Sequence, residues 1–580
     1  MTGEAQRGPR GGDRRAFVLA CLALVLGWVY VARLGQGLWE DGYFVKRFAY
    51  NYWHHGSFSW NVSDGPVYGM TSQTLQLLGT ALYWLAPDYV VTTMKAVSCA
   101  SLVALLAVLA TFSPASAASA DGTASAASAD GAARDAEAGG GVARLLPSLV
   151  ALSGVVVIEA TFTGLETALG LLLVALASRE LLRSPRGGYD ALRIAALLEG
   201  VYLTRPDALW IPAFLLAARW LSAAAQRWKQ GSPGVGRELA VLTAALALTA
   251  AALGLTLLVL HGYYGTALPL PFYLKTHGWS AQDPGYVAPF AAEKLKNLTQ
   301  IVFLAAPLVF VALHERSRAV WLLLAAGLSF FAYHGFATIE TMGYYSRFYL
   351  PGLVPLMAAA QLGYASFLRR RRWGWVVALY AGYVLAFILL KYVDNAHTVA
   401  IKVRAHLYLP ALVALGLVLL CPLRWQRWGV LAVGACLCLG TALTFPMSWP
   451  RLETDEVILL RQASPRTAFP GIERLRAALA PKVIYHTDMG APGLLFPEAK
   501  VVDLDGLLNE AVTLRGARFD ELCRADRPEA IYYPKPNYAR LRAEMSTSPC
   551  FQDYRAVTPQ GVARLYVRSD LVAMFTAYEP

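Results

Sequence analysis

Apolar runs alternate with short polar connections along most of this chain. The runs are about 15 to 24 residues long, close to the length that an α-helix needs to cross the hydrocarbon core of a bilayer. Because lipid offers no hydrogen bonds to a peptide backbone, such runs predict membrane-spanning helices. They lie near residues 16–34, 145–161, 164–178, 191–203, 207–217, 239–261, 299–314, 319–336, 350–368, 373–390, 404–421 and 428–446.

The polar connections carry an orientation signal. Arginines gather in every second connection, and cytoplasmic connections are the ones enriched in Lys and Arg. The clusters are Arg179, Arg183 and Arg186; the stretch from Arg219 to Arg237; Arg316 and Arg318; Arg369 to Arg372; and Arg424 and Arg427. The tail 1–15 is also rich in arginine, so we predict a cytoplasmic N-terminus and a C-terminus on the outer side. The run that follows is too long for a signal-peptide core and lacks a clean cleavage site, which indicates a first span.

Two segments between the first runs need separate treatment. Residues 72–112 are long enough for two spans, whereas the alternation allows only one. We therefore predict that one of the two is interfacial or re-entrant, for a total of about 13 spans. Residues 113–143 are rich in Ala, Ser, Asp and Gly, a composition typical of a flexible, disordered loop.

The pattern changes from Trp449 onward. Apolar stretches shorten to strand length in KVIYH, KVVDL and AIYYP, and helical stretches alternate with them. This predicts a membrane domain over residues 16–447 and a small soluble α/β domain over residues 448–580. If this second domain is extracytoplasmic, Cys523 and Cys550 either form a disulfide or remain free thiols. Asp488, Asp503 and Asp505 fit structural turns of such a domain better than they fit a site.

Composition agrees with a membrane protein. Of 580 residues, 56% are hydrophobic and 16% are charged, and the mean hydropathy is +0.42. The formal net charge of +12 is also typical of nucleic-acid-binding proteins. Here, however, the arginines stand beside apolar runs, where the bilayer explains them, so we predict no nucleic-acid partner.

Unusual polar residues gather on the predicted outer side, although they played no part in assigning it. Ionisable groups at membrane depth are costly unless they serve a site, so this grouping predicts a site at the outer face. The residues are Glu40 and Asp41 in the loop 35–71, Glu166, Arg205 and Asp207 in short turns, Lys275 in the loop 262–296, and Glu340 and Arg347 before Pro351.

Several short motifs resemble those of the GT-C membrane glycosyltransferases. The first loop has the pattern ED-GYF-x-x-R-x-x-x-N followed by GPVYGMTSQTL, and it is similar to that of arabinofuranosyltransferases that use a polyprenyl-phosphate sugar. Further matches occur in the same order as in the family: TGLETAL, LTRPDALW, YYGTALPLPFYLKT, RFYLPGLVPL, TDMGAPGLL and VVDLDGLLNE. Together they cover residues 16 to about 510.

This resemblance implies a GT-C-like helical bundle and an activity. The expected reaction is an inverting-type transfer of a sugar from a polyprenyl-phosphate donor to a cell-envelope glycan, lipid or protein acceptor at the outer face of a bacterial inner membrane. The acidic pair of the family maps onto Glu40 and Asp41, with Asp41 as the expected base. Basic positions for the donor phosphate map onto Lys275 and Arg347, and Arg47 is a further candidate.

Other interpretations of these residues remain open. Glu40 and Asp41 also suit a solvated helix end, and Lys275 and Arg347 suit interfacial snorkelling. Arg205 and Asp207 form a structural ion pair or bind substrate, with the ion pair favoured.

Two more candidates carry the same ambiguity. Glu166 contacts sugar hydroxyls or caps a helix, and Tyr264 is a substrate-binding candidate through its motif. His54, His55 and His277 lack metal-ligand spacing, so no cofactor is assigned, although a divalent cation stays open. A secondary transporter and a non-catalytic envelope-assembly protein are the alternative functions.

Overall fold

The computed structural model describes most of the helical part and most of the C-terminal part of the chain. The described residues are 42–112, 145–152, 157, 165–185, 187–230, 233–276, 284–338, 346–370, isolated positions between 374 and 385, 453–462, 469–535, 538–558 and 564–578. Glu40, Asp41, His277, Glu340, the loop 113–143 and the predicted spans 16–34, 404–421 and 428–446 lie outside them.

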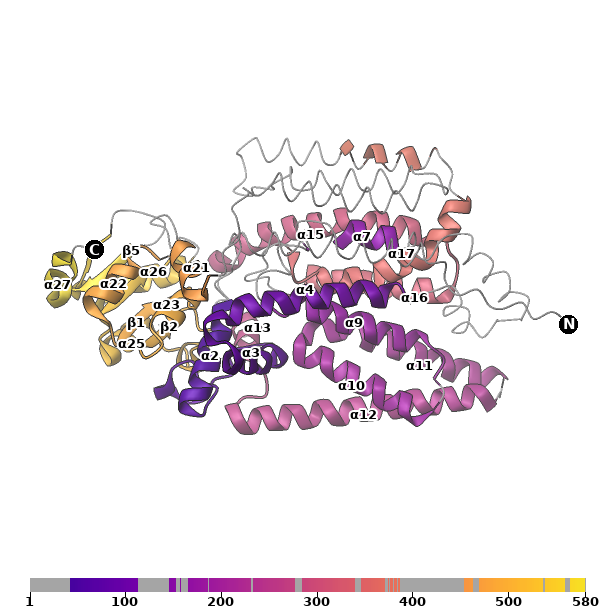
Figure 1. Cartoon of the computed structure of the whole chain (residues 1–580), viewed down its shortest axis with the longest axis horizontal. Coiled ribbons are helices and arrows are strands. Elements are labelled where there is room, and N and C mark those ends of the chain that lie inside the picture. The colour runs from indigo at the N-terminus through magenta and orange to yellow at the C-terminus, as the bar shows by residue number, and fades with distance from the viewer. Residues whose placement is uncertain are drawn as a thin grey trace.

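A bundle of long helices forms the larger part, and a small sheet with flanking helices forms the rest (Figure 1). In Figure 1 the bundle helices lie roughly side by side, and the sheet stands at one end of them, next to α2 and α3. The bundle helices are α2 (Gly42–His55), α3 (Gln73–Leu85), α4 (Val90–Leu109), α7 (Leu146–Leu152), α9 (Thr167–Leu182), α10 (Gly188–Thr204), α11 (Trp210–Gln230), α12 (Pro233–Tyr264), α13 (Leu270–Thr276), α15 (Pro284–Ala312), α16 (Arg318–Ala337) and α17 (Leu350–Arg370).

Five helices of the described part are long and apolar enough to cross a membrane. They comprise residues Pro87–Leu109, Pro206–Lys229, Gly234–Tyr264, Arg318–Ala337 and Leu350–Arg370. The chain is therefore a multi-pass membrane protein, while the predicted total of 13 spans extends beyond what these residues test. With 13 residues, α3 is too short to cross a bilayer unaided. This agrees with the prediction that only one of the two segments in 72–112 is a span.

Two predicted boundaries were wrong, for the same physical reason. The run 207–217 was expected to stop near Arg219, yet α11 continues to Gln230. The Arg219 guanidinium is compensated inside the bundle by Glu238 and by the carbonyls of Leu181 and Arg183, so it does not end the helix. Likewise α15 begins at Pro284, well inside the predicted loop 262–296: Glu293, Lys294 and Lys296 lie within the helix, and Lys294 donates to the Thr338 carbonyl, so these charges do not mark a loop.

Helix α17 is the centre of the bundle. Almost every residue from Leu350 to Leu368 is buried, and α17 contacts α7, α9, α15 and α16. Close approach is possible because small residues face the neighbours: a Cβ at Gly363 would lie 2.8 Å from the Val311 carbonyl of α15, and one at Gly352 would lie 2.5 Å from Phe331 of α16. Small residues at helix contacts are typical of membrane bundles, where dispersion replaces the hydrophobic effect.

The C-terminal part is a five-stranded mixed sheet, as the alternation of short strands and helices predicted. Its strand order is β2-β1-β3-β5-β4; β1 is parallel to β2 and to β3, and β5 is antiparallel to β3 and to β4. The strands are β1 (Val483–His486), β2 (Lys500–Asp503), β3 (Ala530–Tyr533), β4 (Tyr554–Ala556) and β5 (Arg564–Arg568). The accompanying helices are α21 (Asp455–Gln462), α22 (Ile472–Leu479), α23 (Gly490–Leu495), α24 (Glu510–Thr513), α25 (Phe519–Asp526), α26 (Ala539–Thr547) and α27 (Val572–Ala577).

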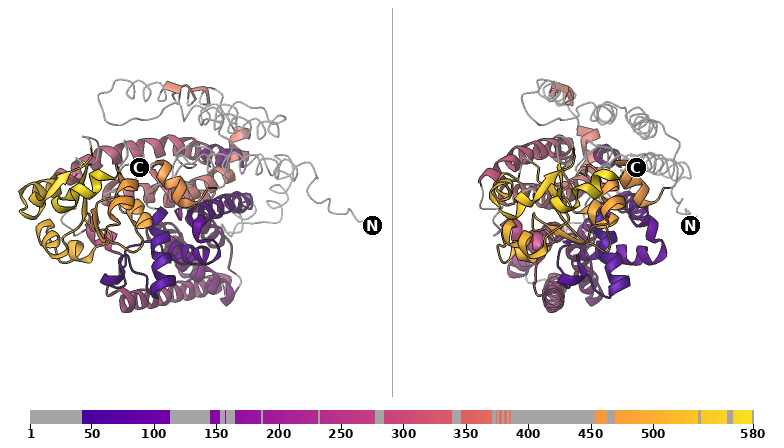
Figure 2. Two further views of the ribbon diagram at one scale, coloured as in Figure 1. Left: turned by 60° about the vertical axis from the view of Figure 1, so that its left-hand side comes forward. Right: turned by 90° about the vertical axis from the view of Figure 1, so that its left-hand side faces the viewer.

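The two faces of this sheet bury different partners. Tyr485 and Ile531 pack with α25 and α26 on one face, where Cys523 and Cys550 form a disulfide. Ile484 and Tyr532, on the other face, share one hydrophobic core with α2, α3 and α4. Figure 2 shows the same adjacency from two further directions. The sheet is thus packed onto the first helices of the bundle through a continuous apolar core.

A buried ion pair ties the same elements together. Lys46 Nζ on α2 lies 3.3 Å from an Asp455 carboxylate oxygen on α21, and the Asp455 side chain is fully buried. Asp455 also accepts hydrogen bonds from the backbone N–H groups of Val91 and Thr92. These N–H groups belong to the first turn of α4, where a carboxylate is stabilised by the helix dipole. One side chain therefore joins α2, α4 and α21.

Candidate functional site

The predicted acidic pair directly precedes the first described residue. Glu40 and Asp41 lie outside the described residues, and α2 begins at Gly42. The start of α2 is held tightly, because Tyr43 and Val45 are fully buried. A Cβ at Gly79 of α3 would lie 1.9 Å from Val45, so this contact requires glycine.

Arg47, a predicted phosphate ligand, is engaged within the protein. Its side chain is 2% exposed, and its guanidinium lies over the Trp60 ring at 4.7 Å. All five of its N–H donors meet protein oxygens at 2.6–3.2 Å: the carbonyls of Trp60, Gly493, Phe496 and Ala499, and Oδ1 of Asn61. We call Arg47 and these partners the Arg47 network. Because the network leaves no Arg47 N–H for an anion, the prediction that Arg47 binds the donor phosphate was wrong.

The Arg47 network extends into β2 and stays charged at neutral pH. Trp60 Nε1 donates to the Val501 carbonyl at 2.8 Å, and the Val501 N–H donates to Asn61 Oδ1 at 2.8 Å. Burial lowers the pKa of Arg47 to about 9, and the attraction of Glu498 opposes this shift. A guanidinium with that pKa remains protonated at pH 7, so its bonds to carbonyls are charge-assisted.

Arg205 and Asp207 form the ion pair that the sequence favoured. Pro206 disfavours a helical conformation at Arg205, which is extended (φ −156°, ψ 92°) and ends α10. The chain then turns through Pro206–Leu209, and Arg205 Nε reaches Asp207 Oδ1 at 3.2 Å. The other oxygen of Asp207 lies 3.2 Å from His334 Nε2 on α16. His334 was not predicted, because a single histidine in an apolar run gives no signal of its own.

Two arginines converge on one aromatic ring beside this pair. The guanidinium carbons of Arg205 and Arg347 lie 5.5 Å and 5.2 Å from the centre of the Phe348 ring. The His334 ring also stacks on Phe348, at 5.9 Å and nearly parallel. Arg205 is 4% exposed, and its Nη1 has no hydrogen-bond partner among the described residues. A buried guanidinium nitrogen with an unused donor, next to a second arginine, is suited to an anion.

The first turns of α3 connect this arginine cluster to Tyr264. Thr204, next to Arg205, donates to Thr74 at 3.0 Å, and the Tyr264 hydroxyl donates to Gln76 at 3.3 Å. Tyr264 also stacks on Tyr68 at 4.9 Å. Three predicted residues, Arg205, Asp207 and Tyr264, are thereby brought to the same end of the bundle.

Glu166 and Lys275 lie near the same region but on separate elements. Glu166 immediately precedes α9, without a side-chain capping bond; one turn later, a Cβ at Gly170 would lie 3.7 Å from the Arg205 Cβ. Lys275 lies on α13, whose first N–H, from Leu270, donates to the Tyr68 carbonyl. Helix α13 also contacts α24 of the C-terminal part. The direction of the Lys275 side chain is outside what the structure describes.

The acidic residues at the turns of the sheet bind neighbouring groups of the same domain, as structural turn residues do. Asp503, at the end of β2, is buried and accepts from the N–H groups of Asp505 and Leu508. Burial raises the pKa of Asp503 to about 6, and its bonds to backbone N–H groups oppose the rise. Asp488 pairs with Lys535 at 2.6 Å. Among the described residues no group of three or more His, Cys, Asp or Glu is arranged to hold a metal ion.

Architecture and site together define a class: a multi-pass helical membrane protein with a C-terminal α/β unit and a polar cluster at the bundle end next to that unit. No protein-family model matches the sequence, and no curated protein matches it. Two solved structures share the fold, and both are ArnT from Cupriavidus metallidurans.

The undecaprenyl-phosphate-bound form of ArnT has a TM-score of 0.56 at 13% identity, over 95% of this chain and 97% of that one. The apo form has a TM-score of 0.51 at 13% identity, over 97% and 99%. This chain therefore has the fold of ArnT, a GT-C glycosyltransferase, which confirms at the level of fold the resemblance seen in its motifs.

Proposed function

We propose that this chain is a glycosyltransferase that takes a sugar from a polyprenyl-phosphate carrier and transfers it to an acceptor at the outer face of the inner membrane. The observation that carries the proposal is the arginine cluster of Arg205, Arg347 and Phe348, set in a fold shared over almost the whole chain with a protein that binds undecaprenyl phosphate. The family motifs in matching order add independent support.

The cluster suits the leaving group of such a reaction. When the bond between the anomeric carbon and the phosphate oxygen breaks, the carrier phosphate takes the electron pair and gains negative charge. Arg205 Nη1 has no partner among the described residues, and the Arg347 guanidinium lies near the same Phe348 ring. The donor phosphodiester carries one negative charge, and the departing polyprenyl phosphate gains a second. Two guanidinium groups at this place therefore stabilise the departing phosphate more than they stabilise the donor, which lowers the barrier.

Asp207 and His334 keep Arg205 in position for this role. A guanidinium held on one edge by Asp207 can present its other edge to a ligand without further loss of side-chain entropy. Asp207 is held in turn by His334 from α16. In this proposal Asp207 and His334 are positioning residues, whereas Arg205 and Arg347 touch the donor.

The acid–base step is assigned to Asp41. Its carboxylate takes the proton of the acceptor hydroxyl as that oxygen attacks the anomeric carbon from the side opposite the phosphate, which inverts the configuration. Glu40 supports the acceptor, and Lys275, Glu166 and Tyr264 complete the donor and sugar contacts. The donor is a polyprenyl-phosphate sugar, and the acceptor is a cell-envelope glycan, lipid or protein; the disulfide Cys523–Cys550 supports an extracytoplasmic C-terminal part.

A binding experiment tests the phosphate site directly. Undecaprenyl phosphate is titrated against the purified full chain in detergent, and the bound fraction is measured by native mass spectrometry. We expect Arg347→Gln and Arg205→Lys to weaken binding by about 10- to 100-fold, the effect of a lost charge-assisted hydrogen bond. Arg316→Gln, an exposed arginine outside the cluster, is the matched control. Equal affinity of all variants would remove the cluster from the site.

Activity is tested in the cell. The glycolipids and envelope glycans of a deletion strain are profiled after complementation with wild type or Asp41→Asn. We expect wild type to restore a missing sugar and Asp41→Asn not to restore it. Restoration by both would refute the role of Asp41 as base, and an unchanged glycan profile in the deletion strain would favour a non-catalytic assembly protein.

A further inference from the structure

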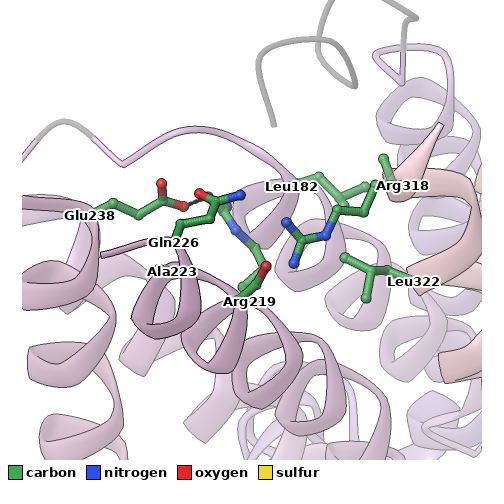
Figure 3. A pocket seen from close by; sticks show the side chains of 9 residues that line it. Leu182, Arg219, Ala223, Gln226, Glu238, Arg318 and Leu322 are labelled. Carbon is green, nitrogen blue, oxygen red and sulfur yellow. Dashed lines mark hydrogen bonds and ion pairs between the residues drawn. The ribbon is translucent and has the colours of Figure 1, made fainter. Parts of the chain in front are cut away.

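A small basic recess lies at the other end of the bundle, away from the arginine cluster. It is shallow, with a cavity volume of about 20 Å³, and it opens to solvent. The end of α9, the second half of α11, and the first turns of α12 and α16 enclose it, as Figure 3 shows. Its polar lining residues are Arg219, Ser222, Gln226, Glu238 and Arg318. The sequence placed these arginines in cytoplasmic connections but did not bring them together.

The two arginines of this recess differ in their hydrogen-bond partners. Arg219 is compensated, because it donates to Glu238 and to the carbonyls of Leu181 and Arg183. Arg318 has no hydrogen-bond or ion-pair partner among the described residues. In Figure 3 its guanidinium points across the recess toward Arg219. The recess thus holds two guanidinium groups and one carboxylate, that of Glu238, which pairs with Arg219, so its net charge is positive.

The backbone adds to this positive potential. Arg318 is the first residue of α16, a 20-residue helix whose N-cap, Ser317, makes no side-chain capping bond. The N–H groups of a helix start and the helix dipole both favour an anion. Ser222 and Gln226, one turn apart on α11, add hydroxyl and amide groups on the facing wall. The recess thus combines a charged donor, a helix N-terminus and neutral donors around one small space.

The surroundings indicate that the anion belongs to a lipid. α11, α12 and α16 are three of the helices fit to cross a membrane, so the recess lies where those helices end. On the outside of α11, Leu221 and Trp228 are 62% and 92% exposed. An exposed leucine followed two turns later by an exposed tryptophan is typical of a helix leaving the acyl layer for the headgroup layer. Basic pockets between helices at this depth bind phospholipid headgroups.

We propose that this recess binds the phosphate group of an anionic phospholipid, with Arg318 as its main ligand. The lipid is a structural partner of the helix ends and is separate from the polyprenyl phosphate at the arginine cluster. This inference does not depend on the proposed function. A free phosphate ion has the same chemistry as the headgroup, so the experiment separates the two.

The test measures lipid retention by the intact chain. The protein is purified from nanodiscs of mixed phosphatidylglycerol and phosphatidylcholine, and the lipids that stay bound are counted by native mass spectrometry. We expect wild type to retain phosphatidylglycerol over phosphatidylcholine, and Arg318→Gln to lower that retention about tenfold, as for one charge-assisted hydrogen bond. Arg370→Gln, an exposed arginine at the end of α17 that does not line the recess, is expected to behave as wild type.

Further arms exclude trivial outcomes. Arg318→Lys keeps the charge and is expected to retain most of the lipid, which distinguishes a binding defect from misfolding. Inorganic phosphate at millimolar concentration is expected not to displace the lipid. Equal retention by wild type and Arg318→Gln, or displacement by inorganic phosphate alone, would overturn the proposal.

Discussion

Replacing Arg47 by methionine is expected to detach the C-terminal part of the chain from α2 without unfolding either one. Methionine keeps the apolar volume of the side chain but removes all five donors of the Arg47 network. The Trp60 and Phe496 carbonyls keep a second donor, from Asn51 Nδ2 and the Ala499 N–H, but those of Gly493 and Ala499 have no other donor among the described residues. At about 2 kcal/mol for each of these two buried unsatisfied carbonyls, the loss is about 4 kcal/mol, or about three decades in the opening equilibrium.

Region-resolved hydrogen exchange measures this opening. The N–H of Val501 donates to Asn61 Oδ1, so peptides that cover residues 490–504 report directly on the contact. We expect their exchange to accelerate about 10³-fold in Arg47→Met. Arg47→Lys keeps the charge but cannot reach five acceptors at once, and an intermediate effect is expected.

A matched control lies in the same domain. Arg524 is 70% exposed and, among the described residues, pairs with Asp520 one turn away, so Arg524→Met is expected to change the exchange free energy by less than about 1 kcal/mol. If Arg47→Met exchanges like wild type in 490–504 while Arg524→Met does too, the Arg47 network does not hold the interface. The reasoning from buried carbonyls would then be refuted.

Three further predictions follow from packing, covalent structure and titration. Gly327→Ala on α16 places a Cβ 2.8 Å from the Gly352 carbonyl of α17 and is expected to lower the stability by about 1–3 kcal/mol. Gly335→Ala on the same helix meets open space and is the control, with almost no expected loss. Equal melting temperatures of the two variants would contradict this packing. Loss of the Cys523–Cys550 disulfide, which closes a 27-residue separation, is expected to destabilise the sheet by about 3.5 kcal/mol on the chain-entropy model, and maleimide labelling with and without reductant shows whether both thiols are blocked in the native chain. Burial raises the pKa of Asp503 to about 6, so the folded state prefers the protonated carboxyl. The stability that this proton adds is fully present below the unfolded pKa near 4 and is lost as the pH rises through about 6. Hydrogen exchange in β2, corrected for intrinsic rates, should show up to about 3 kcal/mol of this pH dependence in wild type and none in Asp503→Asn; identical profiles would refute the assignment.

Hydrophobic patterning predicted the spans where the chain faces lipid or other apolar helices. The predicted run 239–261 corresponds to α12, and the runs 319–336 and 350–368 correspond to α16 and α17. Prediction failed where a charge is compensated by a distant partner. Arg219 suggested a helix end, yet Glu238 from α12 allows α11 to continue. A single sequence does not show such a distant partner, so the hydrophobic pattern predicted the end of this helix at residue 217 instead of Gln230.

The candidate site was predictable in its local pairs and not in its tertiary neighbours. Arg205 and Asp207 are two residues apart, so their ion pair followed from the RPD motif. His334 and Phe348 come from more than a hundred residues later and join the site only through the packing of α16 and α17. Arg47 was predicted wrongly for a different reason. Its charge suggested a phosphate ligand, but its guanidinium binds mainly main-chain carbonyls. Every residue has a carbonyl, so the sequence does not show which of them will accept from an arginine.

Asp455 sets an order of events for biogenesis. Its partner Lys46 lies 409 positions earlier, so the first helices are synthesised and inserted long before the carboxylate that neutralises them exists. Until Asp455 is made, Lys46 and the first N–H groups of α4 lack this partner. We therefore expect a nascent chain halted before residue 455 to lack the contact that joins α2 and α4 to α21, so that the amino-terminal third reaches its final packing only in the last quarter of translation.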